Sequence, residues 1–196
     1  MNKTIQLLLA TTLVCSGQEF TKGYNAIQAG YGQAVVRTYT NVGMKTDTVH
    51  VNYQGMNEAS NGYFFGRESL RIGKNGLPVD AIAVTRLTGS LAPKLLDTAY
   101  GARFAMPKKK GLYGYIDALK HTGIGISGYR GLESVVFAGK EVKGWNFETT
   151  QAFKQGRKPF SEVEVLTPAL KKHIKLRGFA RYDSPKDLTF GLQRTF

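Results

Sequence analysis

Apolar and polar side chains alternate through the last two dozen residues of the chain. Between 173 and 182 the apolar residues fall mostly on one parity and the basic residues on the other, and the alternation returns from 187 to 196. Successive side chains of a β-strand point to opposite faces, so both runs predict strands with one apolar and one polar face. The Asp-Ser-Pro-Lys sequence at 183–186 supplies turn chemistry and predicts that the two strands form a hairpin.

Short runs of the same kind occupy most of the chain before this hairpin. The residues from 48 to 55 and from 160 to 166 alternate, and 24–40 is rich in Gly, Ala, Val and Tyr. We expect 24–40 and 48–55 to pair as a first hairpin across a loop at 41–47. The stretch from 121 to 143 is the least regular part of the chain.

Turn signals follow almost every run. Asn-Gly and Pro occur within 74–78, three lysines stand between Pro107 and Gly111, and 155–159 contains Gly and Pro. Few stretches have helical periodicity. The pattern therefore predicts an all-β protein, an antiparallel up-and-down meander of about ten to twelve strands closed into a small barrel.

A soluble β-sandwich is the alternative fold. Between 63 and 86 the two-face pattern blurs, and a lipid-facing parity there would carry either Arg67 or Glu68. A sandwich accommodates such irregularities at bends and bulges. The sequence thus favours the barrel without excluding the sandwich.

The final ten residues resemble the last strand of bacterial outer-membrane β-barrel proteins. In that family a terminal aromatic residue and the apolar residues at alternate positions before it form the strand that the barrel-assembly machinery reads. The matching positions are Leu188, Phe190, Leu192 and Phe196, whereas Arg194 departs from the usual apolar residue. The resemblance implies an outer-membrane location, with membrane lipids or lipopolysaccharide and the assembly machinery as partners.

The first residues have the layout of a secretory signal peptide. A positive start at 1–3 precedes an apolar run at 4–14 and the small residues 15–17. The run is too short to span a bilayer as a helix. We expect a signal peptide over 1–17 and one β-domain over 18–196. Lipidation of Cys15 and a buried first element of a cytosolic protein are the alternatives.

Composition adds a strong positive charge. The 196 residues include 27 basic and 14 acidic side chains, a formal charge of +13. Such a surplus attracts polyanions, including lipopolysaccharide phosphates and anionic membrane surfaces. Because the single cysteine lies in the predicted signal peptide, the mature domain would have neither a disulfide nor a thiolate metal site.

The sequence offers little catalytic chemistry. His50, His121 and His173 lie far apart in the sequence and match no close-spaced metal-binding pattern. Neither a nucleophile elbow nor a phosphate-binding glycine loop occurs. Glu162 and Glu164 share one strand face, which is most simply a solvated or lumen-facing surface. We therefore expect no enzymatic activity, no cofactor and no metal.

The basic face of the terminal hairpin is the most informative feature for function. If the apolar face meets lipid, the basic face lines the interior, and a cationic lumen favours anionic solutes. The residues expected there are Lys175, Arg177, Arg181 and His173. Alternatively, these cations pair with acids such as Glu162 and Glu164 and fill the barrel, since small barrels have little open interior.

Two functions remain open from the sequence. The first is an outer-membrane barrel with a passive, porin-like or structural surface role. The second is an exported soluble basic β-protein, periplasmic or secreted, that binds a polyanion or packs into a larger assembly. Nucleic acid is an unlikely partner, because no RNA-binding or oligonucleotide-fold signature accompanies the basic and aromatic residues.

Overall fold

The computed structural model describes residues 19–21, 25–31, 36–60, 63–90, 92–170, 172–183 and 187–196. The predicted signal peptide at 1–17 lies outside the described residues. The strands are β1 (Glu19–Thr21), β2 (Asn25–Tyr31), β3 (Val36–Lys45), β4 (Val49–Ser60), β5 (Tyr63–Lys74), β6 (Val79–Gly89), β7 (Lys94–Lys109), β8 (Leu112–His121), β9 (Leu132–Val142), β10 (Trp145–Lys154), β11 (Phe160–Leu166), β12 (Leu176–Asp183) and β13 (Asp187–Thr195). A short 3-10 helix at Lys172–Ile174 precedes β12.

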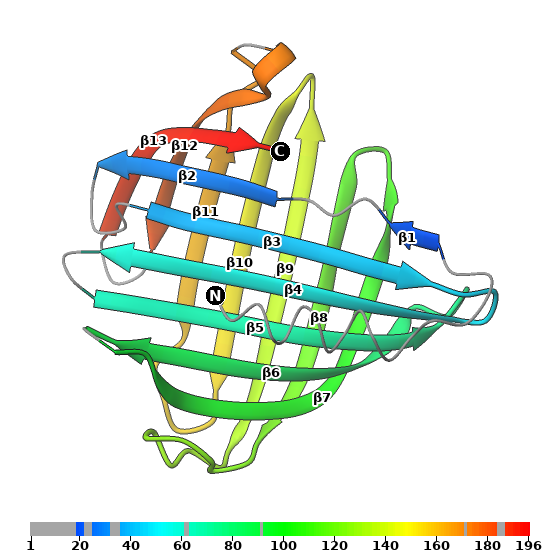
Figure 1. Ribbon diagram of the computed structural model, residues 1–196, viewed down its shortest axis with the longest axis vertical. Coiled ribbons are helices and arrows are strands. Elements are labelled where there is room, and N and C mark those ends of the chain that lie inside the picture. The colour runs from blue at the N-terminus through cyan, green and yellow to red at the C-terminus, as the bar shows by residue number, and fades with distance from the viewer. Residues whose placement is uncertain are drawn as a thin grey trace.

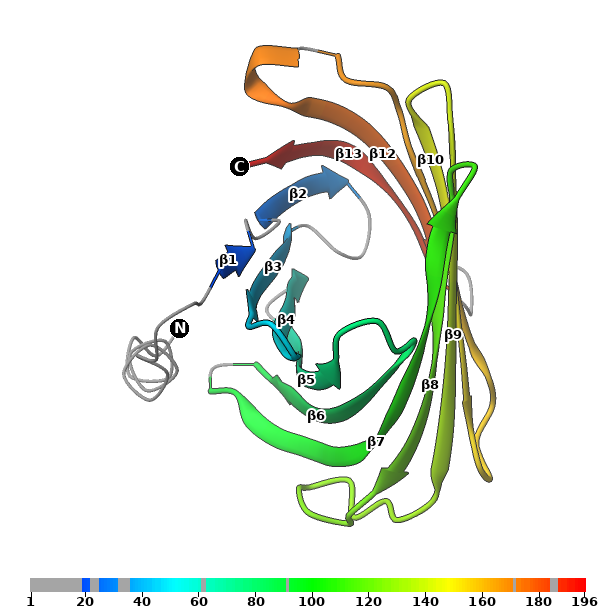
Figure 2. The same ribbon diagram turned by 90° about the vertical axis from the view of Figure 1, so that its right-hand side faces the viewer.

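Strands β2 to β13 form a closed antiparallel barrel. Each strand pairs with its neighbours in the sequence, and β13 pairs with β2 to close the sheet. The short β1 pairs with one end of β3. The near strands β2–β6 cross the far strands β8–β11 steeply, as tilted barrel strands do (Figures 1 and 2). The predicted meander is confirmed with twelve barrel strands, and the predicted sandwich is not formed.

Connections alternate between the two ends of the barrel. One end, called the terminal end below, carries residue 196 and the connections 46–48, 75–78, 110–111, 143–144 and the described part of 167–175. The other, called the loop end, carries the connections 122–131 and 155–159. The loop 122–131 folds back on β7, where Ile126 N donates to Leu95 O at 3.0 Å.

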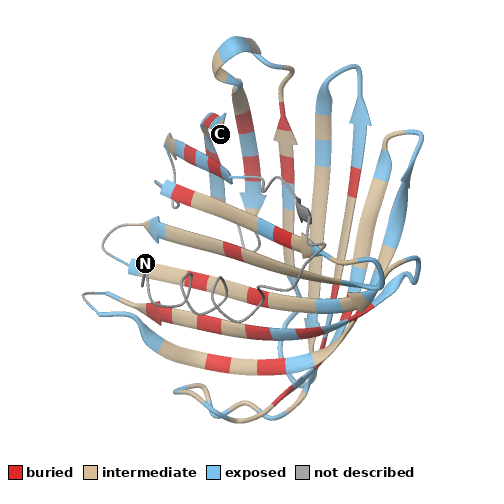
Figure 3. Ribbon diagram, turned by 45° about the vertical axis from the view of Figure 1, so that its right-hand side comes forward, coloured by how far each residue is buried: buried red, intermediate tan, exposed pale blue. Residues whose placement is uncertain are grey.

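Side-chain burial alternates along the strands with polar residues inside. In β6 the buried positions are Asp80, Ile82, Val84, Arg86 and Thr88, while Val79, Ala81 and Ala83 are exposed. Figure 3 shows the same alternation of buried and less buried residues along neighbouring strands. The apolar part of the interior is small, and its one cluster of buried residues is formed by Ile82, Val84, Ala99 and Leu119. The other buried apolar residues among those described are Ala26, Val135, Leu166 and Phe179. Polar and charged side chains fill most of the rest.

Two predicted element boundaries were wrong. The run 24–40 is not one strand, because it contains β2 and the first half of β3, and the predicted loop at 41–47 continues β3 to Lys45. The second half of β3 looks like a loop in the sequence because its inward residues, such as Asn41, are polar. Its outward residues, such as Val42, are apolar. The strand expected from residue 173 begins instead at Leu176, since Lys175 has a φ of 48° and interrupts the extended backbone.

Candidate functional site

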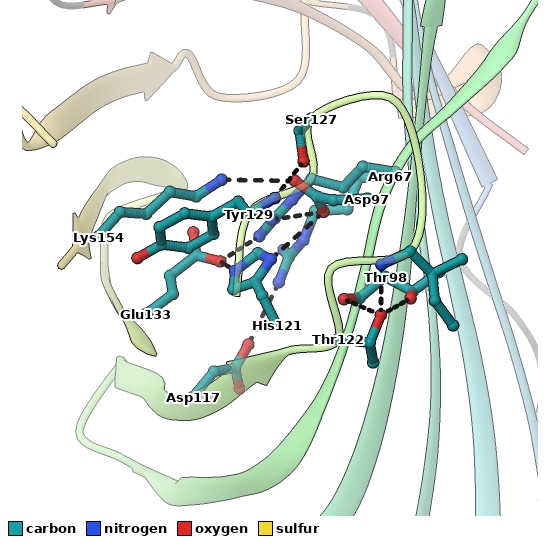
Figure 4. Close-up of polar contacts among 12 residues, drawn as sticks. Arg67, Asp97, Thr98, Asp117, His121, Thr122, Ser127, Tyr129, Glu133 and Lys154 are labelled. Carbon is teal, nitrogen blue, oxygen red and sulfur yellow. Dashed lines mark hydrogen bonds and ion pairs between the residues drawn. The ribbon is translucent and has the colours of Figure 1, made fainter. Parts of the chain in front are cut away.

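A buried histidine lies between two carboxylates near the loop end (Figure 4). His121 Nε2 is 2.8 Å from Glu133 Oε2, and Nδ1 is 3.6 Å from Asp97 Oδ1. Arg86 contacts both acids, at 3.0 Å to Asp97 and 2.5 Å to Glu133. Lys154 Nζ lies 3.7 Å from Asp97 Oδ2. Four strands, β6, β7, β8 and β9, thus hold one charged group, and β10 adds the lysine.

An aromatic side chain from the loop 122–131 covers this group. The Tyr129 ring packs edge-on against His121 with a centroid distance of 4.7 Å. The Tyr129 hydroxyl donates to the carbonyl oxygens of Leu132 and Gln155, at 2.9 and 3.0 Å. These bonds fix the loop to β9 and to the residue that follows β10, beside the histidine.

A second charged group lies deeper in the interior. Arg103 forms two hydrogen bonds to Asp117, 2.6 Å from Nε and 2.7 Å from Nη2. Its Nη1 donates to Gln54 of β4 at 2.9 Å, and its guanidinium lies 3.5 Å from the Tyr115 ring centroid. Arg67 also contacts Asp117, at 3.3 Å. Bidentate pairing and ring stacking are the geometries that arginine satisfies better than lysine.

A third group lies toward the terminal end. The Asp80 carboxylate lies 2.9 Å from His50 Nε2 and 3.2 Å from Arg71 Nη1. Arg71 also donates to Asn52 at 2.8 Å, and His50 Nδ1 lies 3.2 Å from Asn75 Oδ1. Polar contacts therefore continue along the interior from one end of the barrel toward the other.

The opposite side of the interior has its own ion pairs. Arg37 of β3 contacts Glu58 of β4 at 2.5 Å and Glu162 of β11 at 2.9 Å. Arg181 of β12 lies 3.2 Å from Asp183 and 3.5 Å from Glu58. The pairs Arg37–Glu162 and Arg181–Glu58 join strands that are not neighbours in the sheet. These contacts cross the interior.

Gln28 ties this group to the strands that close the barrel. Its amide nitrogen donates to Glu164 and to Gln193, both at 2.9 Å, and its oxygen accepts from Arg181 at 3.0 Å. Gln28 is 1% exposed. The closing pair β2–β13 is thus fixed by buried side chains as well as by its backbone ladder.

The interior accounts for most of the acidic residues but few of the basic ones. Among the described residues, nine carboxylates face it, and seven cations face these carboxylates. The acids are Glu58, Asp80, Asp97, Asp117, Glu133, Glu148, Glu162, Glu164 and Asp183, and the cations are Arg37, Arg67, Arg71, Arg86, Arg103, Lys154 and Arg181. Seven minus nine gives a formal interior charge of −2, so the other 20 basic and 5 acidic side chains of the sequence carry a formal charge of +15.

The structure separates the four cations that the sequence placed on one strand face. Arg181 is 1% exposed and belongs to the ion pairs described above. Arg177 lies near the terminal end and donates to the carbonyl oxygens of Thr167 and Gly144, both at 2.6 Å. His173 and Lys175 precede β12 and are exposed at the same end.

The residues predicted to form the assembly signal share one surface. Leu188, Phe190, Leu192 and Phe196 are all exposed on the outside of the barrel. On the inward parity of the same strand, Thr189 and Gln193 are buried. Arg194 is exposed beside Phe196, with its guanidinium 4.9 Å from the ring centroid.

Sequence reasoning missed the group around His121. The sequence placed the histidine in no binding pattern, yet it is 1% exposed and contacts two carboxylates. Asp97 and Glu133 are 24 and 12 residues from it, and neither forms a recognisable motif with it. The sequence could have indicated this group only through strand alternation, because Asp97, His121 and Glu133 all occupy inward positions of their strands.

The described residues contain no group of three His, Cys, Asp or Glu side chains that could hold a metal ion. No helix in the described ranges is long and apolar enough to cross a membrane. Comparison of the chain with protein-family profiles, with curated proteins and with solved structures found no match.

Proposed function

We propose that this chain is a bacterial outer-membrane β-barrel with an ion-paired interior and a structural, surface-exposed role. The observation that carries the proposal is the apolar outer surface. Large hydrophobic side chains on this surface are between 43% and 52% exposed on eight different strands. They include Ile27, Val42, Ile72, Phe104, Ile116, Phe147, Val163 and Phe190.

A surface of this kind is costly in water and favourable in hydrocarbon. Single exposed apolar residues are ordinary, but a continuous apolar area larger than a few hundred Å² marks a membrane or protein contact. Membrane barrels have this inverted pattern, with apolar residues outside and polar residues inside. The lengths of β4, β5, β6, β9 and β10, from 10 to 12 residues, match the roughly 9–11 that a spanning strand needs.

The same pattern weighs against an exported soluble protein. A soluble sandwich or barrel would bury the apolar parity and expose the charged one. Here Phe190 is 52% exposed, while Arg103 and Arg181 are 1% exposed. A buried arginine needs acids beside it, and the interior places Asp117 next to Arg103 and Asp183 next to Arg181.

The interior favours a structural role over anion transport. Arg181, which the sequence placed among the anion-attracting residues, is paired with acids, as are Arg37 and Arg103. Paired cations attract solutes weakly, and the formal interior charge of −2 does not favour anions. In this proposal the partners are the lipids around the barrel and an assembly machinery that reads the outward face of β13.

Cell fractionation tests the proposal. We expect the chain, expressed in a Gram-negative host, to sediment with the outer membrane and to resist extraction by alkaline carbonate. On gels, unheated samples should migrate differently from boiled ones, because a closed barrel resists detergent until it is heated. N-terminal sequencing of the mature protein tests the predicted cleavage near residue 17. Recovery in the aqueous fraction, with no heat-dependent mobility, would reject the membrane assignment.

A further inference from the structure

The β9–β10 hairpin at the terminal end has an open groove on its outer surface. The groove has a volume of about 320 Å³ and is lined by Val142, Lys143, Trp145 and Phe147. The Trp145 and Phe147 rings are stacked with centroids 6.4 Å apart, and they are 41% and 46% exposed. Apart from the lysine, its lining residues are apolar. The groove therefore combines an apolar wall with one cationic edge.

Lys143 has no acidic partner among the described residues. Two nearby lysines are already engaged: Lys108 pairs with Glu141 at 2.8 Å, and Lys140 donates to the backbone carbonyl oxygen of Lys110 at 2.8 Å. Lys143 is exposed at the turn itself. It is thus available to an anion that approaches the groove from outside.

The surroundings of the groove strengthen its attraction for anions. At the terminal end the exposed described cations far outnumber the exposed described acids, which are Asp47 and Glu141. The cations are Lys45, Lys74, Lys108, Lys109, Lys110, Lys140, Lys143, Lys175 and Arg194. Because the interior is close to neutral, this end carries much of the positive surplus.

Lys143 occupies the first position of a tight hairpin turn. Lys143 and Gly144 have φ values of 49° and 85°, the two positive angles of a type I′ hairpin turn. Asn is strongly preferred over Lys at the first of these positions. The β7–β8 turn repeats the arrangement, with Lys110 at 48° and Gly111 at 77°. Both turns keep a lysine where asparagine would be less strained.

We propose that the groove binds one anionic phospholipid. The acyl chain lies along Val142, Trp145 and Phe147, and the ammonium group of Lys143 binds the phosphodiester. An aromatic pair beside a lysine is the combination that suits the boundary between hydrocarbon and headgroups. This inference rests on the proposed function, since it requires the outer surface of the barrel to lie in a bilayer.

Trp145 allows a direct test, because it is the only tryptophan in the chain. The protein is reconstituted in phosphatidylcholine vesicles that contain a small fraction of either dibrominated phosphatidylglycerol or dibrominated phosphatidylcholine. Bromine quenches tryptophan fluorescence on contact. We expect the anionic lipid to associate with the groove about fivefold more strongly than the zwitterionic lipid, the ratio expected of one lysine near an anionic surface.

Two substitutions serve as a matched pair. Lys143→Asn removes the charge but suits the positive φ, so the hairpin is retained, and the two brominated lipids should then quench equally. Lys158→Asn removes an exposed lysine from the connection 155–159 at the loop end, and the preference for the anionic lipid should persist. Added glycerol phosphate should leave quenching unchanged, since it lacks an acyl chain. Its displacement of the lipid would overturn the assignment of a lipid site.

The outcomes separate the inference from the proposed function. Equal quenching of the unsubstituted protein by both lipids would overturn the lipid site while leaving the membrane barrel intact. Absence of quenching by either lipid would place Trp145 outside the bilayer and would contradict both. A preference that survives Lys143→Asn would show that the lysine does not select the lipid.

Discussion

Arg86 illustrates how single residues hold the interior together. Its guanidinium contacts two buried carboxylates, at 3.0 Å to Asp97 and 2.5 Å to Glu133, and the same carboxylates flank His121. Removing one partner of a buried pair costs far more than the pair contributes, because the remaining charge is left without compensation. Arg86 thus stabilises the barrel mainly because, without it, Asp97 and Glu133 would be buried without its charge beside them.

Substitution of Arg86 by methionine should therefore be strongly destabilising. We expect Arg86→Met to lower the free energy of unfolding by about 3–5 kcal/mol, measured by urea titration of the reconstituted protein. The matched control is Arg157→Met in the exposed connection 155–159, which should change it by less than about 1 kcal/mol. Equal effects of the two substitutions would contradict the role assigned to the buried pairs.

A second residue-scale prediction concerns backbone strain at the terminal end. Lys110 has a φ of 48°, which asparagine adopts more readily than lysine. Lys110→Asn should raise the free energy of unfolding by up to about 1 kcal/mol. Lys109→Asn makes the same change in charge one residue earlier, within β7, and should not stabilise the protein. If both variants shift stability alike, charge rather than strain is the cause.

At the scale of elements, β5 shows why its alternation was hard to interpret from sequence. Its outward parity carries Glu68, and its inward parity carries Arg67, so a charge falls on each face. Arg67 contacts Asp117 of β8, three strands away in the sheet. The side chain of Glu68 lies between Gly55 of β4 and Thr85 of β6, both on the outer surface.

Adjacent substitutions in β5 should act in opposite directions. Glu68→Leu should stabilise the protein in vesicles by up to about 2 kcal/mol, because a charge facing lipid is replaced by an apolar group. Arg67→Leu should destabilise it by about 1–3 kcal/mol, because Asp117 loses a partner. Urea titration of both variants in the same vesicles makes the comparison. A register slip of one residue would reverse the two signs.

Whether a strand could be predicted from the sequence depends on what its two faces contact. The pairing of the terminal hairpin was predicted correctly, apart from the start of its first strand, because Leu188, Phe190 and Leu192 alternate with residues of a polar interior. The second half of β3 was missed because inward Asn41 and Gly43 look like loop residues when the polar side of the strand is the buried one. In a barrel with a polar interior, polarity does not mark exposure, so sequence rules made for proteins with apolar interiors fail there.

Most of the interior contacts could not have been predicted from the sequence. Arg37 and Glu162 are 125 residues apart, and Gln28 and Gln193 are 165 apart. Their proximity depends on closure of the barrel and on its register, neither of which a single strand encodes. The sequence did offer Glu162 and Glu164 as partners for the cations of the terminal hairpin, and Arg181 lies 3.8 Å from Glu164. The other partners required the fold.

At the scale of the whole molecule, charge is partitioned between the interior and the two ends. The interior has nine carboxylates and seven cations, whereas the chain as a whole has 14 acidic and 27 basic residues. Positive charge on both sides of an apolar belt suits a barrel whose ends meet anionic headgroups. An interior near neutrality suits side chains that pair with each other instead of attracting solutes.

This distribution of charge predicts which ions would pass through the barrel if its interior ion pairs were removed. In planar bilayers the unsubstituted protein should show little conductance, because its ion pairs cross the interior. Combining Arg37→Ala with Arg181→Ala removes two large side chains and leaves Glu58 and Glu162 without these partners. The formal interior charge changes from −2 to −4, so the variant should conduct and prefer cations.

The control for this variant removes the same number of cations from the surface of the loop end. Lys94→Ala combined with Lys158→Ala leaves the interior pairs intact and should not open a path. Reversal potentials in a salt gradient give the selectivity. Large anion-selective currents from the unsubstituted protein would contradict an ion-paired interior and would restore the cationic channel expected from the terminal hairpin. Because the two variants lose equal charge, a difference between them can come only from the position of the cations in the barrel.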